Sequence, residues 1–418
     1  MPHHGSLGSS FEEQLWERRI QRVMNDYENF TENDLPYLNI SGKYSDYLKT
    51  IVKDLHERIN SALKTVRDPE LSTEVARVLS GATSYNLSRT WHTILDVTQN
   101  TAAQSIPKDL YFFMDSIYER LGGEEVPYFI KLTLTVLVPG TLDISKYVLR
   151  PFLINLREAY NYLANKKAYV IFTTPSIIKN PIDWALLIHE AAHILEEEKL
   201  QIVEEFFPQI RSESYLTGHD LVSTSTFPVE EAMPNWALEI ACDIISTISC
   251  GPIFGYRLLD NFLREEKEIF ETHPPIKKRL QLISNELENY GWNEAAADIR
   301  AKSERVKLPE VIEKLVLPKQ CTEIIDKIKE KTRQEGLEYR CTPELADRLK
   351  IIGTRLNDLK PCVTVGGKNV DLKDMLNASQ YVNSELKESQ EFKDFMADMI
   401  RLISAREFYQ KYKSTVSD

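Results

Sequence analysis

The sequence predicts an α+β protein that is predominantly helical, with one small sheet in the middle of the chain. Apolar residues recur at three- and four-residue spacings over both ends of the 418 residues, which is typical of amphipathic helices. Between these ends the pattern alternates strand, helix, strand, helix. We therefore predict three regions: a helical region over 1–125, a core over 126–300 and a second helical region over 301–418.

The elements of the first half follow from local patterns. The helical period runs from Phe11 to about Leu121, where Gly122 and Gly123 break it. Residues Tyr128–Val138 alternate and are rich in β-branched and aromatic side chains, so they predict a strand. A helix over roughly 151–164 and a short strand over Ala168–Thr173 follow. The next helix begins at Pro181.

The second half returns to helical patterns from about Ala232, with breaks at glycines and prolines. The segment Pro361–Leu372 contains two adjacent glycines between short alternating runs, and it predicts a small hairpin. The run Glu196–Glu198 predicts a solvated helix end, because charged side chains are seldom buried.

Composition excludes several classes of function. The net charge of −12 disfavours nucleic acid as a partner, because binding phosphates needs clustered Lys and Arg. It also disfavours anionic membranes, and we find no apolar stretch long enough to span one. The five cysteines form no CxxC pair, and the start of the chain lacks a signal-peptide core. We expect a soluble cytoplasmic protein.

The helix that begins at Pro181 carries the main motif. Asn180 is a good N-cap, Pro181 fits the first helical position, and Asp183 lies in the first turn. His189 and His193 are four residues apart, so both imidazoles project from one face, where they can reach one tetrahedral zinc ion at about 2.0–2.1 Å.

Glu190 follows the first histidine and can reach a water molecule at the metal, as a base rather than as a ligand. The alternative is a core helix that carries two histidines by chance. Its apolar flanks favour the metal, because buried imidazoles and a buried carboxylate are costly unless something satisfies them.

A second helix offers the third ligand that a catalytic zinc needs. We expect Asn235 to be its N-cap and Gly251-Pro252 to end it. Glu239 and Asp243 lie four apart on one of its faces. Glu239 would bind the ion, and Asp243 would accept the free N–H of a ligand histidine. The alternative is a solvated edge of an amphipathic helix. His219, in a polar stretch, is a weaker ligand candidate.

HExxH followed by ExxxD resembles the gluzincin class of zinc peptidases. The stretch Thr272–Leu280, which contains His273-Pro-Pro and Arg279, resembles the HtpX and CAAX prenyl-protein endopeptidase family, and Ser249–Pro252 resembles its soluble prokaryotic relatives. The resemblance covers about Ala168–Leu282. It implies a zincin-like core made of a small sheet, the HExxH helix and the Glu-ligand helix. The chain departs from the named membrane enzymes in having no membrane span.

These inferences lead us to expect one zinc ion held by His189, His193 and Glu239, in an endopeptidase with Glu190 as general base. The resemblance implies that His273 stabilises an oxyanion; the alternative is that it caps a helix ahead of Pro274. Tyr256 is a weaker candidate. The resemblance also implies that Ala168–Thr173 lies at the cleft edge and pairs with extended peptide.

Two other functions stay open. Cys242 or His219 could close the metal site and make it structural or sensory. Alternatively, the chain could be a helical partner-binding protein with a degenerate site. The helical ends, each the size of a domain, could cover the cleft or dock a regulatory partner.

Overall fold

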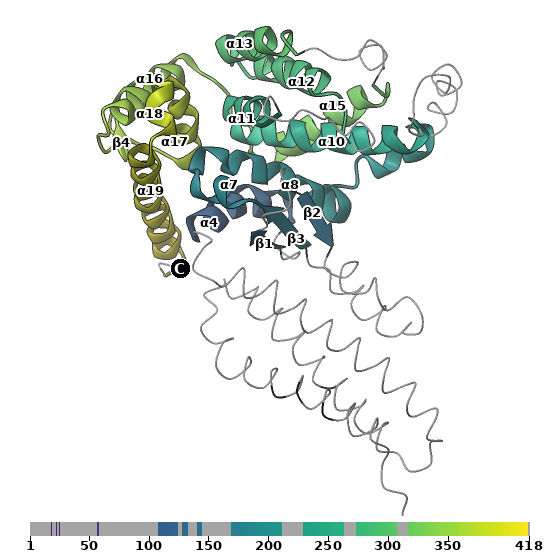
Figure 1. Ribbon diagram of the computed structural model, residues 1–418, viewed down its shortest axis with the longest axis horizontal. Helices are drawn as coiled ribbons and strands as arrows, with labels where there is room; N and C mark the ends of the chain where they lie inside the picture. Colours follow the sequence, from purple (N-terminus) through teal and green to yellow (C-terminus); the bar gives the residue numbers. More distant parts are fainter. Residues whose placement is uncertain are drawn as a thin grey trace, which may run out of the picture. The chain divides into compact units, whose positions relative to one another are not determined.

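The computed structural model is predominantly helical (Figure 1). It describes residues 108–123, 128–132, 140–143, 169–210, 229–262, 273–306 and 317–416, together with Arg18, Arg22, Asn25 and Glu57. The predicted helix over 151–164 and most of the predicted N-terminal helical region lie outside these residues.

The α-helices in the described ranges are α4 (Lys108–Tyr118), α7 (Pro175–Lys179), α8 (Ala185–Leu195), α10 (Val229–Cys250), α11 (Pro252–Phe262), α12 (Ile276–Asn289), α13 (Asn293–Ser303), α15 (Cys321–Gln334), α16 (Pro343–Asn357), α17 (Leu372–Ala378), α18 (Ser384–Glu388) and α19 (Gln390–Val416). Short 3-10 turns are η3 (Glu119–Leu121), η6 (Pro181–Trp184), η8 (Glu204–Phe206) and η9 (Ser379–Tyr381), and η7 (Glu196–Leu200) is a π-helical turn.

Three strands form one small sheet in the order β1 (Tyr128–Leu132), β3 (Tyr169–Thr173) and β2 (Gly140–Asp143). The predicted strands at 128 and 168 are therefore present, although residues 133–139 lie outside the described ranges. β3 is the central strand, and Tyr169, Val170 and Ile171 are fully buried. The expectation that this strand lies at a cleft edge is wrong, because β1 and β2 occupy both of its sides.

The contacts between residues divide the chain into two compact units. The first contains residues 1–106, 126–132 and 142–170, and the second contains 107–125, 133–141 and 171–418. The boundaries that we predicted near residues 125 and 300 stay a prediction. All the candidate site residues of the described part lie in the second unit, so the site can be described within that unit alone.

The helix with the HExxH motif begins later than predicted. Residues Pro181–Trp184 form the 3-10 turn η6, and α8 starts at Ala185. The Asn180 side chain makes no capping bond to the backbone and instead donates from Nδ2 to Asp183 Oδ2 at 2.8 Å. Because the turn already orders the chain ahead of α8, Asn180 is not the cap of the motif helix.

The long helix α10 lies at the centre of the second unit and packs against α8, α11, α12 and α15 (Figure 1). It starts at Val229 and contains Pro234, so Asn235 is not its N-cap. Every residue from Trp236 to Cys250 is buried except Leu238, which is partly exposed. A helix that is apolar on all sides is one that other elements surround, and here it carries two carboxylates into the core.

The predicted hairpin at Pro361–Leu372 is present as β4 (Thr364–Val365) and β5 (Lys368–Asn369), which pair antiparallel. Gly366 and Gly367 form its turn with φ values of 59° and 73°. Two successive residues at positive φ make the turn that fits the twist of a tight hairpin, and glycine adopts them without steric cost.

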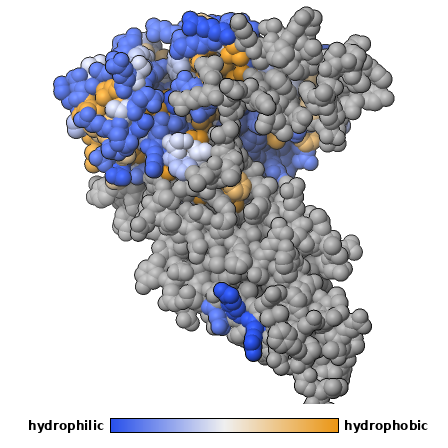
Figure 2. Space-filling model, viewed as in Figure 1, coloured by the Kyte–Doolittle hydropathy of each residue, from blue (hydrophilic) through white to orange (hydrophobic). Residues whose placement is uncertain are grey.

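The described surface in Figure 2 is mostly hydrophilic, with smaller hydrophobic areas between the polar ones. The large apolar side chains that are exposed in the described ranges lie on different elements: Ile351, Tyr381 and Leu402. No described helix combines the length and the apolar composition that a membrane span requires.

Candidate metal centre

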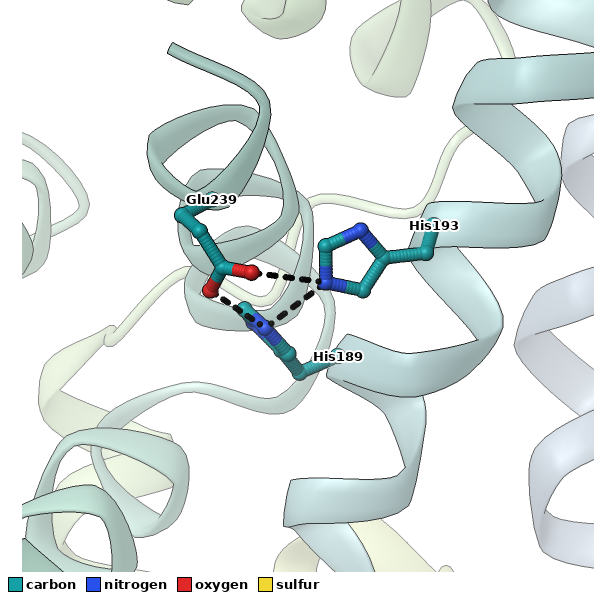
Figure 3. A group of neighbouring side chains, drawn as sticks. All are labelled: His189, His193 and Glu239. Carbon is teal, nitrogen blue, oxygen red and sulfur yellow. Dashed lines mark hydrogen bonds and ion pairs between the residues drawn. The ribbon is translucent and has the colours of Figure 1, made fainter. Parts of the chain in front are cut away.

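Three side chains from two helices meet in the core of the second unit (Figure 3). His189 and His193 come from α8, and Glu239 comes from α10. His189 Nε2 lies 3.2 Å from His193 Nε2 and 3.2 Å from Glu239 Oε2. His193 Nε2 lies 3.3 Å from Glu239 Oε1. The structure therefore brings together the three residues that the spacing of the sequence selected.

These separations match those of ligands around one ion. Atoms that bind a tetrahedral zinc ion at about 2.0–2.1 Å lie about 3.3 Å from one another. Two imidazole nitrogens and one carboxylate oxygen also form the donor set of a catalytic zinc site that keeps its fourth position open. The group can therefore hold a metal ion.

Burying these ionisable side chains would destabilise the folded protein unless an opposite charge compensated them. The exposed fraction is 8% for the His189 side chain and 9% for that of Glu239, so the solvated-edge alternative for Glu239 does not hold. Burial would lower the pKa of the His189 imidazole, but Asp243 and Glu239 outweigh burial and raise the pKa to about 10. Burial likewise would raise the pKa of Glu239, yet His193 and His189 hold it well below its usual range. A proton on His189 thus fills the role that a metal ion would take.

Asp243 lies behind His189, on the side away from Glu239. Its Oδ1 is 3.0 Å from His189 Nδ1, a close contact that is not aligned as a regular hydrogen bond. Arg279 on α12 donates to both Asp243 oxygens at 2.7 Å, from Nε and from Nη2. Burial opposes ionisation of Asp243, but Arg279 and His189 lower its pKa, so it stays a carboxylate.

Phe254 on α11 stacks on His189 from a further helix, with ring centres 6.0 Å apart and planes inclined by 12°. His189 is therefore held by Phe254, by Asp243 and by the other two members of the group. For His193 Nδ1 we find no comparable contact within the described part of the chain.

His273 precedes α12 and faces the same group. Its Nε2 lies 3.4 Å from Glu239 Oε1, and 35% of its side chain is exposed. Burial lowers its pKa, so the ring is neutral at physiological pH. His193 is also partly exposed, whereas His189 and Glu239 are not. Among the described residues, solvent reaches the group from the side of His273 and His193.

Glu190 is buried on α8, next to His189 along the chain. Tyr256, the weaker oxyanion candidate, bonds Asp298 on α13, and Lys302 lies 5.2 Å from its ring centre. His219 lies outside the described residues. Cys242 is not part of the group, and burial together with nearby carboxylates raises the pKa of its thiol well above the usual range. Its place outside the group weakens the idea of a site closed by Cys242.

Glu196 contradicts the expectation of a solvated helix end. Its exposed fraction is only 3%, and it opens the π-helical turn η7 directly after α8. The backbone N–H of Val203 donates to its Oε1, while Oε2 is buried without a hydrogen bond. Sequence reasoning missed this burial because the two acidic neighbours Glu197 and Glu198 made the run resemble a charged surface.

The chain matches no family model, no curated protein and no solved structure.

Proposed function

We propose that this chain is a zinc-dependent endopeptidase with a zincin-like catalytic core. The observation that supports this most is the group of His189, His193 and Glu239, whose spacing suits a single tetrahedral ion, with Glu190 next to the first ligand. When bound, zinc supplies a Lewis acid that acidifies water and polarises a carbonyl group.

The chain's own residues supply the proton transfers. Glu190 takes a proton from the attacking water and delivers it to the leaving amine, as a general base and then as a general acid. His273 is neutral, and in this proposal it donates to the developing oxyanion of the peptide carbonyl. It faces Glu239 from the exposed side, where substrate would approach.

Peptide backbone is the substrate that this proposal implies. An extended segment would bind mainly through its backbone, and so with little demand on sequence. We propose a cytoplasmic location and a regulatory partner on the terminal helical regions as further parts of this function.

The deciding experiment replaces Glu190 with Gln. We expect the E190Q variant to bind zinc as the wild type does but to hydrolyse a quenched fluorescent casein at least about 100-fold more slowly, because the general base is lost. Glu197, exposed at the end of the same helical stretch, provides the matched control E197Q. The proposal is refuted if E190Q retains cleavage, or if the wild-type protein binds no zinc.

A further inference from the structure

A single guanidinium group contacts Glu239 and Asp243, the two carboxylates of α10 that are described as buried. Arg279 comes from α12 and is 36 residues from Asp243 in sequence, and only 2% of its side chain is exposed. Its Nη2 and Nε hold the two Asp243 oxygens, and Nη2 also lies 3.4 Å from Glu239 Oε2. Arg279 is thus the link between the metal ligand Glu239 and the residue behind His189.

Arg279 fixes the orientation of the Asp243 carboxylate and also compensates its charge. A guanidinium that donates two parallel bonds holds a carboxylate in one plane, because its donors form a rigid fork. The oriented Asp243 then places an oxygen 3.0 Å from His189 Nδ1, which leaves Nε2 directed at Glu239. The contacts run from Arg279 on α12 through Asp243 on α10 to His189 on α8.

We propose that Arg279 is a positioning residue that holds His189 and Glu239 in their metal-binding geometry before an ion arrives. The inference rests on the proposed function to the extent that the group binds zinc. It adds a role for a residue that would touch neither the ion nor the substrate.

If the role of Arg279 were purely electrostatic, its removal would change the zinc affinity in the opposite direction. A cation 3.4 Å from a ligand carboxylate repels an incoming dication, so removing that cation alone would tighten zinc binding. Loss of an orienting partner behind the ligands instead weakens metal binding, typically by about 10- to 100-fold. The direction of the change therefore separates positioning from simple charge tuning.

The test measures the zinc dissociation constant of the full chain by competition with a chromophoric chelator, at a temperature where each variant is folded. We expect R279M to bind zinc about 10- to 100-fold more weakly than the wild type. R279K should also bind weakly, because an ammonium group keeps the charge but cannot span both Asp243 oxygens. Unchanged or tighter binding by R279M would overturn the proposal.

A control comes from Arg257 on α11, which forms ion pairs with Asp183 and Asp260, none of them a member of the metal group. R257M should be destabilised but should keep the wild-type zinc dissociation constant. If R257M loses zinc affinity as strongly as R279M does, general destabilisation explains the result and the positioning role is wrong.

A second variant, D243N, tests the inference if R279M folds poorly. D243N preserves the size of the side chain and should weaken zinc binding by a similar factor. The double variant R279M/D243N should bind no more weakly than either single variant, because both act through the same contacts with His189 and Glu239. Additive losses would contradict this. If the wild type binds zinc and none of these variants changes its affinity, only this inference is refuted. If the wild type binds no zinc, the proposed function is refuted.

Discussion

Glu239 and Asp243 are buried one turn apart on α10, and each is compensated by neighbouring side chains rather than by solvent. Arg279 and His189 contact both of them, and His193 and His273 contact Glu239. A buried charge that loses its partner costs about 3–5 kcal/mol. Removing one of these partners would therefore destabilise the fold more than removing an exposed charge would.

Glu196 provides a prediction about pH at the residue scale. Burial raises the pKa of its carboxyl from 4.5 to about 7, although the N–H groups of Val203 and Ile202 oppose the shift. The folded state therefore binds this proton more tightly than the unfolded state, and stability falls as pH rises from about 4.5 to 7. The total loss is about 3 kcal/mol. The E196Q variant has no such proton to lose. We therefore expect its free energy of unfolding, relative to that of the wild type, to rise by about 3 kcal/mol between pH 4.5 and 7.

Urea denaturation at several pH values measures this effect. E197Q is the control, because Glu197 is exposed one residue further along and should leave the pH dependence unchanged. A difference in unfolding free energy between E196Q and the wild type that stays constant with pH would show that Glu196 is not protonated in the folded protein.

The sequence was sufficient to identify the residues that are separated by a short, characteristic spacing. The four-residue spacing of the histidines, and that of Glu239 and Asp243, selected the helix faces that meet. The contact of Arg279 with Asp243 could not be derived from spacing, because it joins helices that are distant in sequence. One signal was available: Arg279 interrupts the apolar stripe of Ile276, Leu280 and Ile283, and a buried cation there requires a buried anion.

At the scale of elements, the end of α10 is fixed by Gly251. This residue has φ of +73°, and a Cβ there would lie 2.7 Å from Cδ1 of Tyr339. We expect G251A to lower the free energy of unfolding by at least about 1–2 kcal/mol for the left-handed backbone, and by more because the Tyr339 ring must move. Chemical denaturation of the variant measures the loss.

Gly122 is a matched control for the backbone part of this cost. Its φ is +88°, and a Cβ there would meet no atom within 4 Å. G122A should therefore show the left-handed cost alone. Equal losses for G122A and G251A would mean that the ring of Tyr339 does not constrain the end of α10.

Elements with strong local signals were predictable, and their partners were not. The strand β3 and the hairpin β4–β5 follow from β-branched residues and from paired glycines. The start of α10 did not, since Asn235 resembled an N-cap, whereas the helix begins at Val229 and continues through Pro234. The central place of β3 depends on pairing with distant strands, which no local pattern specifies.

At the scale of the whole molecule, the C-terminal elements are joined by buried hydrogen bonds to the core that contains the candidate metal site. Asn377 on α17 donates from Nδ2 to the carbonyl of Cys250, and its Oδ1 accepts from the N–H of Ile253. Tyr339 N–H donates to the carbonyl of Ile248 in the last turn of α10. α17 therefore contacts the end of the helix that carries Glu239, and the two should unfold together.

Zinc should consequently protect α17 as well as α10 against hydrogen exchange. An ion at 1,000 times its dissociation constant stabilises the folded state by about 4 kcal/mol, which slows exchange through unfolding by roughly 1,000-fold. We expect peptides from α10 and α17 to slow by similar factors in exchange followed by mass spectrometry, and E239A, which lacks a ligand, to show neither effect. Slower exchange in α10 with no change in α17 would mean that the C-terminal elements open on their own, so that the bonds of Asn377 do not couple them to the metal-binding core.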